Sequence, residues 1–195
     1  MHDSLLDKLA EGLAALPLEL NASVQSGLID YLHLLVKWNR AYNLTAVRQP
    51  EQMVTRHLLD SLVIGPYLQG PRILDVGTGA GLPGIPLALA YPDLHFTLLD
   101  SNGKKIRFVT QAVAELGLTN VDVIQSRIEA FQPVCRFDTI TARGYASIEE
   151  LISLSTRLLA DKGQYLIMIG VYPVAVMDAM PTGYRVDAIH QLSLP

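Results

Sequence analysis

From Arg72 onward, short β-branched and apolar runs alternate with amphipathic segments, and this alternation constrains the fold more than any other feature. The candidate strands are six runs, at 73–76, 95–100, 121–125, 137–142, 164–169 and 184–192. Segments with helical periodicity lie between them, near 82–91, 103–117, 147–160 and 172–180. Strands that alternate with helices predict an α/β fold with a parallel sheet and helices on both of its faces.

The first third of the chain has a different pattern. Its apolar residues follow a helical period, and the breaks fall at Pro17 and near Pro50. We therefore expect helices at about 4–15, 21–40 and 50–64, with Asn21 and Ser23 as candidate caps of the second. The chain divides on this basis into a helical cap at 1–66 and an α/β domain at 67–195.

A glycine-rich loop follows the first predicted strand directly, with glycines at 77, 79 and 81. Glycines allow the backbone to turn sharply and to approach a ligand closely, and the helix that follows favours negative ligand groups at its N-terminus. A dinucleotide fingerprint would need a small residue at position 82, where the chain has Leu82. The pattern is instead G-x-G-x-G, two residues after Asp75.

Two further elements follow the next two strands. Asp100 ends the strand at 95–100, where a carboxylate can accept both ribose hydroxyls of an adenosine. Residues 125–129, with Ser126, Ile128 and Glu129, offer an apolar side chain and backbone amides to an adenine ring. Together with the loop, these elements favour S-adenosylmethionine over a nicotinamide or flavin dinucleotide, and over a purely structural loop. The candidate cofactor-binding residues at this point are Asp75, Gly77, Thr78, Gly79, Gly81, Leu82, Asp100, Ser126, Ile128 and Glu129.

Charge and composition exclude several classes of protein. A net charge of −4 argues against coating nucleic acid by bulk attraction, although 31–60 is locally basic and contains Trp38. This cluster is either a solvated helix face or a nucleic-acid surface. Cys135 is the only cysteine, so we expect no internal disulfide and no cysteine-based metal site. With neither a signal peptide nor a membrane-length apolar run in the sequence, we expect a cytoplasmic protein without metal or membrane contacts, and a monomer.

Six segments carry a resemblance to a known family. The most specific are 37–45 (KWNRAYNLT) and 56–61 (RHLLDS), and 75–86 (DVGTGAGLPGIP), 98–101, 125–129 and 141–143 also match. On these segments the chain resembles the RsmG (GidB) family, which methylates N7 of a guanine in bacterial 16S ribosomal RNA. The resemblance covers nearly the whole chain. It implies a Rossmann-like class I S-adenosylmethionine-dependent methyltransferase fold, with the helical cap facing RNA.

The resemblance also implies roles for individual residues. Gly77 and Leu82 would contact the cofactor, Ile128 and Glu129 would hold its adenine end, and Arg143 would line the site beside the methyl donor. Arg143 is therefore the candidate catalytic residue as well as a cofactor-binding residue. Five cap residues would lie near the RNA substrate: Lys37, Trp38, Asn39, Asn43 and Arg56.

Simpler structural interpretations stand beside these roles. Arg143 could donate to guanine O6 or to a phosphate, or it could pair with Asp138 or Glu129. Trp38 could stack on a base, or pack in the core. His57 and Asp60 could form a general-base pair, but methylation of N7 needs no general base, so we expect a local structural hydrogen bond between them.

The function that we expect is methyl transfer from S-adenosylmethionine to N7 of a guanine in 16S ribosomal RNA. A small-molecule methyltransferase and a cofactor-binding module without turnover are the alternatives. The second arises because the chain has Ile169 where the family usually has lysine. In the family a seventh, antiparallel strand follows position 195, so we expect a natural chain that continues further, and 184–192 as an edge strand that lacks its inner neighbour.

Overall fold

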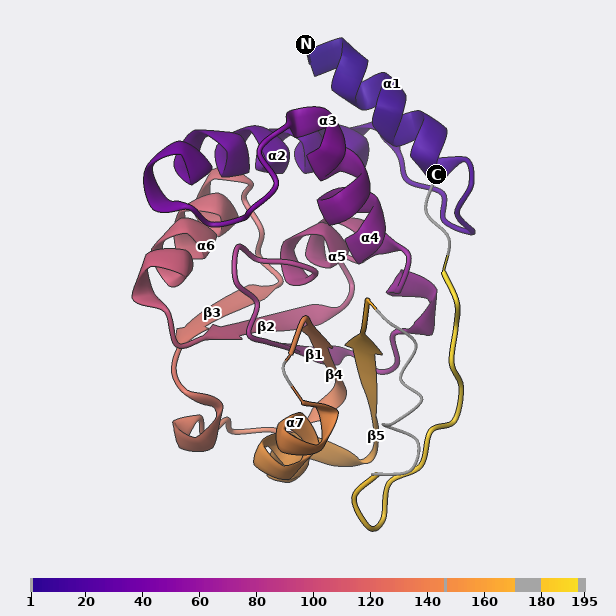
Figure 1. Ribbon diagram of the computed structural model, residues 1–195, viewed down its shortest axis with the longest axis vertical. Helices are drawn as coiled ribbons and strands as arrows, with labels where there is room; N and C mark the ends of the chain where they lie inside the picture. Colours follow the sequence, from indigo (N-terminus) through magenta and orange to yellow (C-terminus); the bar gives the residue numbers. More distant parts are fainter. Residues whose placement is uncertain (1, 146, 171–179, 193–195) are drawn as a thin grey trace.

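A five-stranded parallel sheet forms the centre of the computed structural model, which describes residues 2–145, 147–170 and 180–192 (Figure 1). Its strands are β1 (Arg72–Val76), β2 (His95–Asp100), β3 (Val121–Gln125), β4 (Phe137–Arg143) and β5 (Leu159–Met168). They lie in the order β3-β2-β1-β4-β5, and every neighbouring pair is parallel. The predicted parallel α/β fold is confirmed. The strand order reverses between β1 and β4, and ligands of such sheets bind at the carboxyl ends of the strands at that point.

Helices cover both faces of the sheet, as the alternation of side chains along the strands requires. Ile73 joins the apolar cluster of one face, together with α5 (Gly84–Ala90) and α6 (Gly103–Glu115). Leu74 and Val76 point to the other face, where α7 (Ile148–Ser155) packs. The first cluster is the larger, because the helical cap also contributes to it.

The helical cap packs directly on the α/β region. It contains α1 (His2–Leu13), α2 (Ala22–Tyr42), α3 (Pro50–Met53), η1 (Val54–Leu59) and α4 (Asp60–Leu62). Asn21 caps α2 as predicted, since its side chain accepts from the Val24 amide at 2.9 Å. Leu28, Leu32 and Leu35 lie on one face of α2, almost fully buried, and share a core with Phe96 of β2. The exact division of the chain at residue 66 stays a prediction.

The segment predicted as one helix at 50–64 is interrupted. Residues Val54–Leu59 form a π-helical turn between the short helices α3 and α4. The Asp60 amide bonds to the carbonyls of Thr55 and His57, whereas a regular α-helix would direct it to Arg56. The apolar periodicity gave no sign of this turn, because the segment keeps a buried face throughout.

Near the C-terminus one helix is shorter than predicted, and one predicted strand is wrong. The helix predicted at 147–160 ends at Ser155, and a 3-10 turn, η4 (Thr156–Leu158), leads into β5, which begins earlier than predicted. Residues 184–192 form no strand. The helix predicted at 172–180 lies, apart from its last residue, outside the described residues.

Residues 184–192 run beside β5 without a ladder of hydrogen bonds (Figure 1). The Tyr184 ring packs edge-on against Tyr165 with 5.7 Å between ring centroids, and its hydroxyl donates to Thr156 Oγ1 at 3.0 Å. A groove of about 1390 Å³ is lined by both β5 and this segment. A strand requires a neighbour at ladder distance, and the groove separates this segment from β5.

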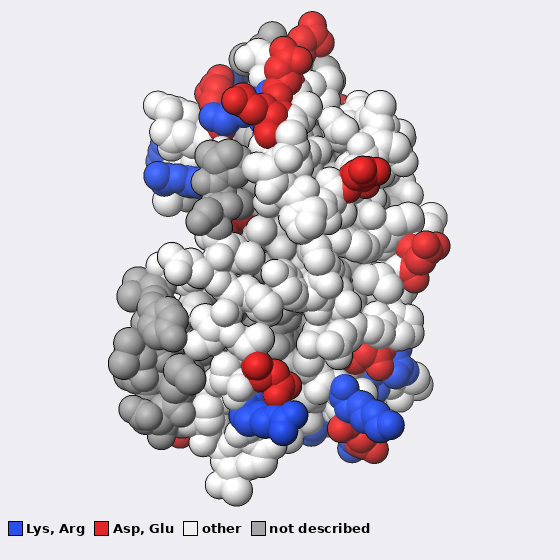
Figure 2. Space-filling view, turned by 90° about the vertical axis from the view of Figure 1, so that its right-hand side faces the viewer, with Lys and Arg blue, Asp and Glu red and all other residues white. Residues whose placement is uncertain are grey.

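The surface in Figure 2 shows one side of the molecule, the right-hand side of Figure 1. Its charged side chains gather toward the two ends, and the middle of this face is largely uncharged. No continuous basic surface is visible on the described part of this face. Among the described helices, none combines the length and the apolar character that crossing a membrane requires.

Candidate active site

The glycine loop after β1 is held at both ends by one buried carboxylate. Asp75 is fully buried, and its Oδ2 accepts from Thr78 Oγ1 at 2.6 Å and from the Gly84 amide at 3.0 Å. The amides of Gly77 and Thr78 donate to the Leu99 carbonyl of β2 at 2.8 and 3.0 Å. Asp75 and Thr78, predicted as ligand contacts, therefore brace the loop from beneath.

The glycines of the loop serve different purposes. Gly77 has a φ of +67°, and a Cβ added there would meet nothing within 4 Å, so the backbone borders open space. At Gly81 a Cβ would lie 2.5 Å from the Ile85 side chain. Gly77 thus leaves room for a ligand, whereas Gly81 permits the close approach of the helix that follows. Leu82 is buried in the larger apolar cluster.

Asp75 has an unsatisfied polar atom. Its Oδ1 is buried and has no hydrogen-bond partner among the described residues. Burial raises the pKa of Asp75 to about 6, and the bonds from Thr78 and Gly84 oppose this rise only in part. A buried acceptor without a donor beneath a glycine loop fits a site that a polar ligand completes.

Asp100 ends β2 beside the same loop. Its Oδ2 accepts from the Gly79 amide at 2.9 Å, and its Oδ1 accepts from the Asn102 amide at 2.8 Å. Each carboxylate oxygen retains a further lone pair, and the residue is half-buried. Asp100 can therefore fix the loop and still accept hydroxyl groups from a ligand.

A cation that we did not single out as a site residue also lies at this loop. Asn102 caps α6 by accepting from the Lys104 amide at 3.0 Å. In the first turn of the helix, Lys105 Nζ lies 3.8 Å from the position of a Cβ on Gly79. The sequence pattern could not distinguish Lys105 from the exposed basic residues beside it. The residue at which α6 begins determines which of these side chains reaches the loop.

The turn after β3 is held in place by an arginine that the sequence did not indicate. The Ser126 amide donates to the Asp100 carbonyl at 3.2 Å, so it is already engaged. Ile128 is buried in η3 (Ile128–Ala130), and Glu129 is exposed. Arg157 donates to the carbonyls of Ile128 at 2.6 Å and Glu129 at 3.1 Å, across 29 and 28 residues.

The helical cap reaches the glycine loop through Tyr31 of α2. Its hydroxyl donates to the Ala80 carbonyl at 2.7 Å, and the side chain is fully buried. Burial raises the pKa of Tyr31 far above its ordinary value, so the hydroxyl remains a donor. No pattern in the sequence indicated that Tyr31 would have a partner 49 residues away.

Arg143 lies at the end of β4, across the switch point from the glycine loop. Its Nη1 pairs with Asp60 Oδ2 at 3.0 Å and donates to the Arg56 carbonyl at 3.2 Å. The alternative partners suggested by the sequence are wrong: Asp138 instead pairs with Arg72 at the far end of the strand.

The local hydrogen bond expected between His57 and Asp60 is also absent from the described contacts. His57 is buried, with its Nδ1 2.9 Å from the Arg56 carbonyl and its Nε2 2.8 Å from Thr45 Oγ1. Burial lowers the pKa of His57, which favours the neutral ring with a proton on Nδ1. Thr45 then donates to Nε2 and accepts from the Val47 amide.

The cap residues expected at the RNA differ in their surroundings. Asn39 is buried and organises the loop after α2, because its Oδ1 accepts from the Thr45 amide at 2.9 Å. Trp38 is partly buried, with its ring 5.3 Å from that of Tyr42 and 5.7 Å from that of Phe108, which favours the packing interpretation. The remaining three are exposed: Lys37, Asn43 and Arg56.

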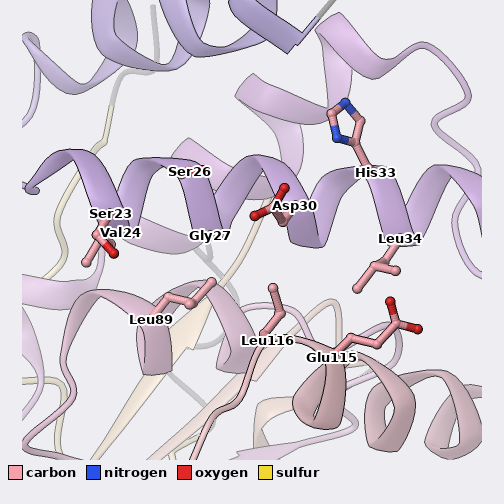
Figure 3. A pocket seen from close by; sticks show the side chains of 10 residues that line it. All are labelled: Ser23, Val24, Ser26, Gly27, Asp30, His33, Leu34, Leu89, Glu115 and Leu116. Atoms are coloured by element: carbon pink, nitrogen blue, oxygen red, sulfur yellow. The ribbon is translucent and has the colours of Figure 1, made fainter.

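A second hollow lies between α2, α5 and α6, away from the glycine loop (Figure 3). Leu34, Leu89 and Leu116 border it, and the carboxylates of Asp30 and Glu115 stand at its rim. Its lining contains no lysine or arginine, and none of the residues proposed for the cofactor. Elsewhere in the described chain, no group of three or more His, Cys, Asp or Glu side chains has a metal-binding arrangement.

Comparison with solved structures shows the fold. Coclaurine N-methyltransferase bound to N-methylheliamine and SAH is 14% identical, with a TM-score of 0.52, over 85% of this chain and 58% of that chain. Precorrin-6y C5,15-methyltransferase from Geobacter metallireducens GS-15 is 17% identical, with a TM-score of 0.51, over 61% of this chain and 66% of that one. Both similarities support the methyltransferase fold only.

Sequence comparison is more specific. The family model described as rRNA small subunit methyltransferase G, GidB, matches residues 24–195. Ribosomal RNA small subunit methyltransferase G of Pseudomonas aeruginosa (strain LESB58) is 50% identical over 190 residues, which cover 97% of this chain and 89% of the relative. The protein of that name from Chromobacterium violaceum is 51% identical over 96% of this chain and 90% of the relative. The chain thus belongs to the rRNA small subunit methyltransferase G family, as the motifs around Trp38, His57 and Gly79 predicted.

Proposed function

We propose that this protein transfers the methyl group of S-adenosylmethionine to N7 of a guanine in 16S ribosomal RNA, in the cytoplasm. One observation carries the proposal within the fold: the glycine loop and Asp100 face Arg143 across the switch point of the sheet. Membership of the family supports the choice of RNA as acceptor.

The residues at the loop fit S-adenosylmethionine. The backbone of 77–81 borders open space for the methionine part, and Asp100 has lone pairs for the ribose hydroxyls. The turn that contains the buried Ile128 borders the region that we assign to the adenine, and Arg157 keeps this turn in place. The unpaired Oδ1 of Asp75 is a buried acceptor that a bound polar group can satisfy.

The chemistry asks little of acid–base groups. The cofactor supplies a methyl carbon on a positively charged sulfur. Guanine N7 already has an in-plane lone pair, so a new N–C bond forms while the C–S pair returns to sulfur, and no proton moves. The protein's task is to align N7, carbon and sulfur. Arg143 can hold the base by donating to guanine O6, because its planar fork matches that edge.

The acceptor must approach from the cap side of the site. Lys37 and Arg56 are exposed there on the cap elements that flank the Arg143 contacts, and Asn43 ends α2 between them in sequence. Long basic side chains bind the phosphates of RNA and release counterions. Such local contacts are compatible with the net charge of −4 of the chain.

The proposal is tested by incubating the protein with S-adenosylmethionine and either purified 16S RNA or small ribosomal subunits. Mass spectrometry of nuclease fragments should show 7-methylguanine at one site, and Asp100→Ala should abolish it under limiting cofactor. Asp122→Ala, which removes an exposed carboxylate paired with His95 on the neighbouring strand, is the matched control. Tight binding of S-adenosylhomocysteine without methylation of either RNA form would identify a binding module instead.

A further inference from the structure

We propose that Asp60 is a positioning residue for methyl transfer, and that the π-helical turn η1 provides a second anchor, the Arg56 carbonyl, for the same guanidinium. The inference rests on the proposed function, because it concerns the alignment of Arg143. It gives a role to the Asp60 carboxylate and to the π-helical turn η1. The chemistry of N7 methylation requires neither of them.

Two groups from one turn of the cap hold Arg143. Asp60 Oδ2 lies 3.0 Å from Nη1, and the Arg56 carbonyl lies 3.2 Å from the same nitrogen, although Arg143 is 83 and 87 residues further along the chain. The side chains of Asp60 and Arg143 are 34% and 25% exposed, so the pair is partly shielded from water. Such a pair is oriented more firmly than an exposed one.

The π-helical turn makes the carbonyl available. In a regular α-helix the Asp60 amide would occupy the Arg56 carbonyl, four residues earlier. Here that amide bonds to Thr55 and His57 instead. The Arg56 carbonyl accepts from Arg143 Nη1 at 3.2 Å, and His57 Nδ1 lies 2.9 Å from the same oxygen. Single π-turns within helices often occur at functional sites, which agrees with this placement.

The anchor is itself fixed by the loop after α2. His57 is held through Thr45 Oγ1, and the Thr45 amide is held by Asn39 Oδ1. The carbonyl that Arg143 contacts is thus connected to the segment that carries Lys37 and Asn43. The cap motifs at 37–45 and 56–61 converge on this single guanidinium.

The geometry leaves the rest of the guanidinium available. Both contacts use Nη1, and Arg143 Nε and Nη2 donate to none of the described residues. An arginine has five N–H donors in one plane, so a tether at one nitrogen fixes the plane while the others remain available to a substrate. Loss of Asp60 should leave Arg143 present but poorly aligned.

The test compares Asp60→Asn, Asp60→Glu, Arg143→Lys and the double variant Asp60→Asn/Arg143→Lys. In single-turnover assays, Asp60→Asn should lower the rate of methyl transfer roughly tenfold, with KM for RNA and affinity for S-adenosylhomocysteine within about twofold of the parent. Asp60→Glu keeps the charge and should restore part of the rate. In the Arg143→Lys background, Asp60→Asn should have little further effect.

Asp138→Asn is the matched control, because it removes the acidic partner of Arg72 at the other end of β4, where the side chains are 41% and 23% exposed. It should lower stability without changing the rate. A rate for Asp60→Asn that equals that of the parent, or effects of Asp60 and Arg143 that simply add, would overturn the proposal.

A spectroscopic measurement separates this proposal from the proposed function. Nitrogen-15 NMR of the Arg143 guanidinium should show restricted rotation of Nη1 in the parent and free rotation in Asp60→Asn. If the parent methylates no RNA, the proposed function fails, yet this signal still decides whether Asp60 positions Arg143. Free rotation in the parent would refute the positioning role.

Discussion

The two halves of the proposed site differ in how they are built. In the cofactor half, Asp75, Asp100 and Tyr31 each bond to backbone groups of the glycine loop, and two of the three are fully buried. In the acceptor half, Lys37 and Arg56 extend into solvent from the cap. The cofactor half is therefore formed before the ligand binds. In the acceptor half, the basic side chains become ordered only when the RNA binds.

This difference leads to distinct expectations for mutation. A change of one atom in the cofactor half leaves a buried group without its partner, so small substitutions should have large effects. In the acceptor half, the basic side chains are already solvated, so their removal should change salt dependence more than stability. The following predictions test that contrast.

The largest effect is expected for Asp100→Ala. It removes a carboxylate that braces the Gly79 amide and that we assign to the ribose hydroxyls. Affinity for S-adenosylhomocysteine, measured by calorimetry, should fall by about 2–4 kcal/mol. Asp122→Ala should leave it unchanged. Equal affinities of the Asp100 variant and the parent would show that the end of β2 does not hold the cofactor.

Tyr31→Phe should have the next largest effect. The substitution keeps the ring but leaves the buried Ala80 carbonyl without its donor at 2.7 Å. The free energy of unfolding should fall by about 1–3 kcal/mol in urea titration, and cofactor affinity should weaken with it. Tyr42→Phe, at a residue that is 44% exposed, is the control and should be neutral. An unchanged stability for Tyr31→Phe would mean that the cap does not brace the loop.

Lys37→Ala combined with Arg56→Ala tests the acceptor half. RNA binding should weaken, and the slope of log affinity against log salt should become shallower by about 1–2 units. Cofactor affinity should not change. Lys162→Ala with Arg185→Ala removes the same charge from exposed positions near β5 and should leave the slope intact. If the cap variant loses cofactor binding and keeps RNA affinity, our division of the site is mistaken.

The smallest effect concerns His57, which connects the halves. Burial lowers its folded-state pKa below the ordinary value of 6.5, so the unfolded chain takes up the proton first. The stability contributed by neutral His57 is present above pH 6.5 and is lost as the pH falls toward the lowered pKa. Thermal unfolding of His57→Gln should therefore depend less on pH than that of the parent as the pH falls below 6.5.

The titration of Asp75 changes the pH dependence of stability in the opposite direction, so the measurement on His57 must correct for it. Its pKa of about 6 lies above the ordinary 3.8, so its contribution to stability is complete below 3.8 and is lost as the pH rises through about 6. The difference between parent and His57→Gln removes this common term. A steeper loss of stability on acidification in the variant than in the parent would contradict the neutral, buried state of His57.

The sequence by itself determined the fold and the position of the cofactor loop. β2 and β3 span the residues predicted for them, 95–100 and 121–125, because β-branched and apolar residues are concentrated there between helical segments. The glycine loop at 77–81 was recognisable for a similar reason. Its glycines follow the first strand directly, and Asp75 and Asp100 lie at or near the ends of the first and second strands. Both are local consequences of composition and spacing.

Only the tertiary structure decided which groups meet across long stretches of chain. Asp60 rather than Asp138 pairs with Arg143, Tyr31 reaches Ala80, and Arg157 holds the turn at Ile128. It also decided that 184–192 forms no strand, because a strand depends on a neighbour at ladder distance as well as on its own residues. These contacts form because segments far apart in the sequence pack together. A residue pattern along the chain does not show which distant segments will meet.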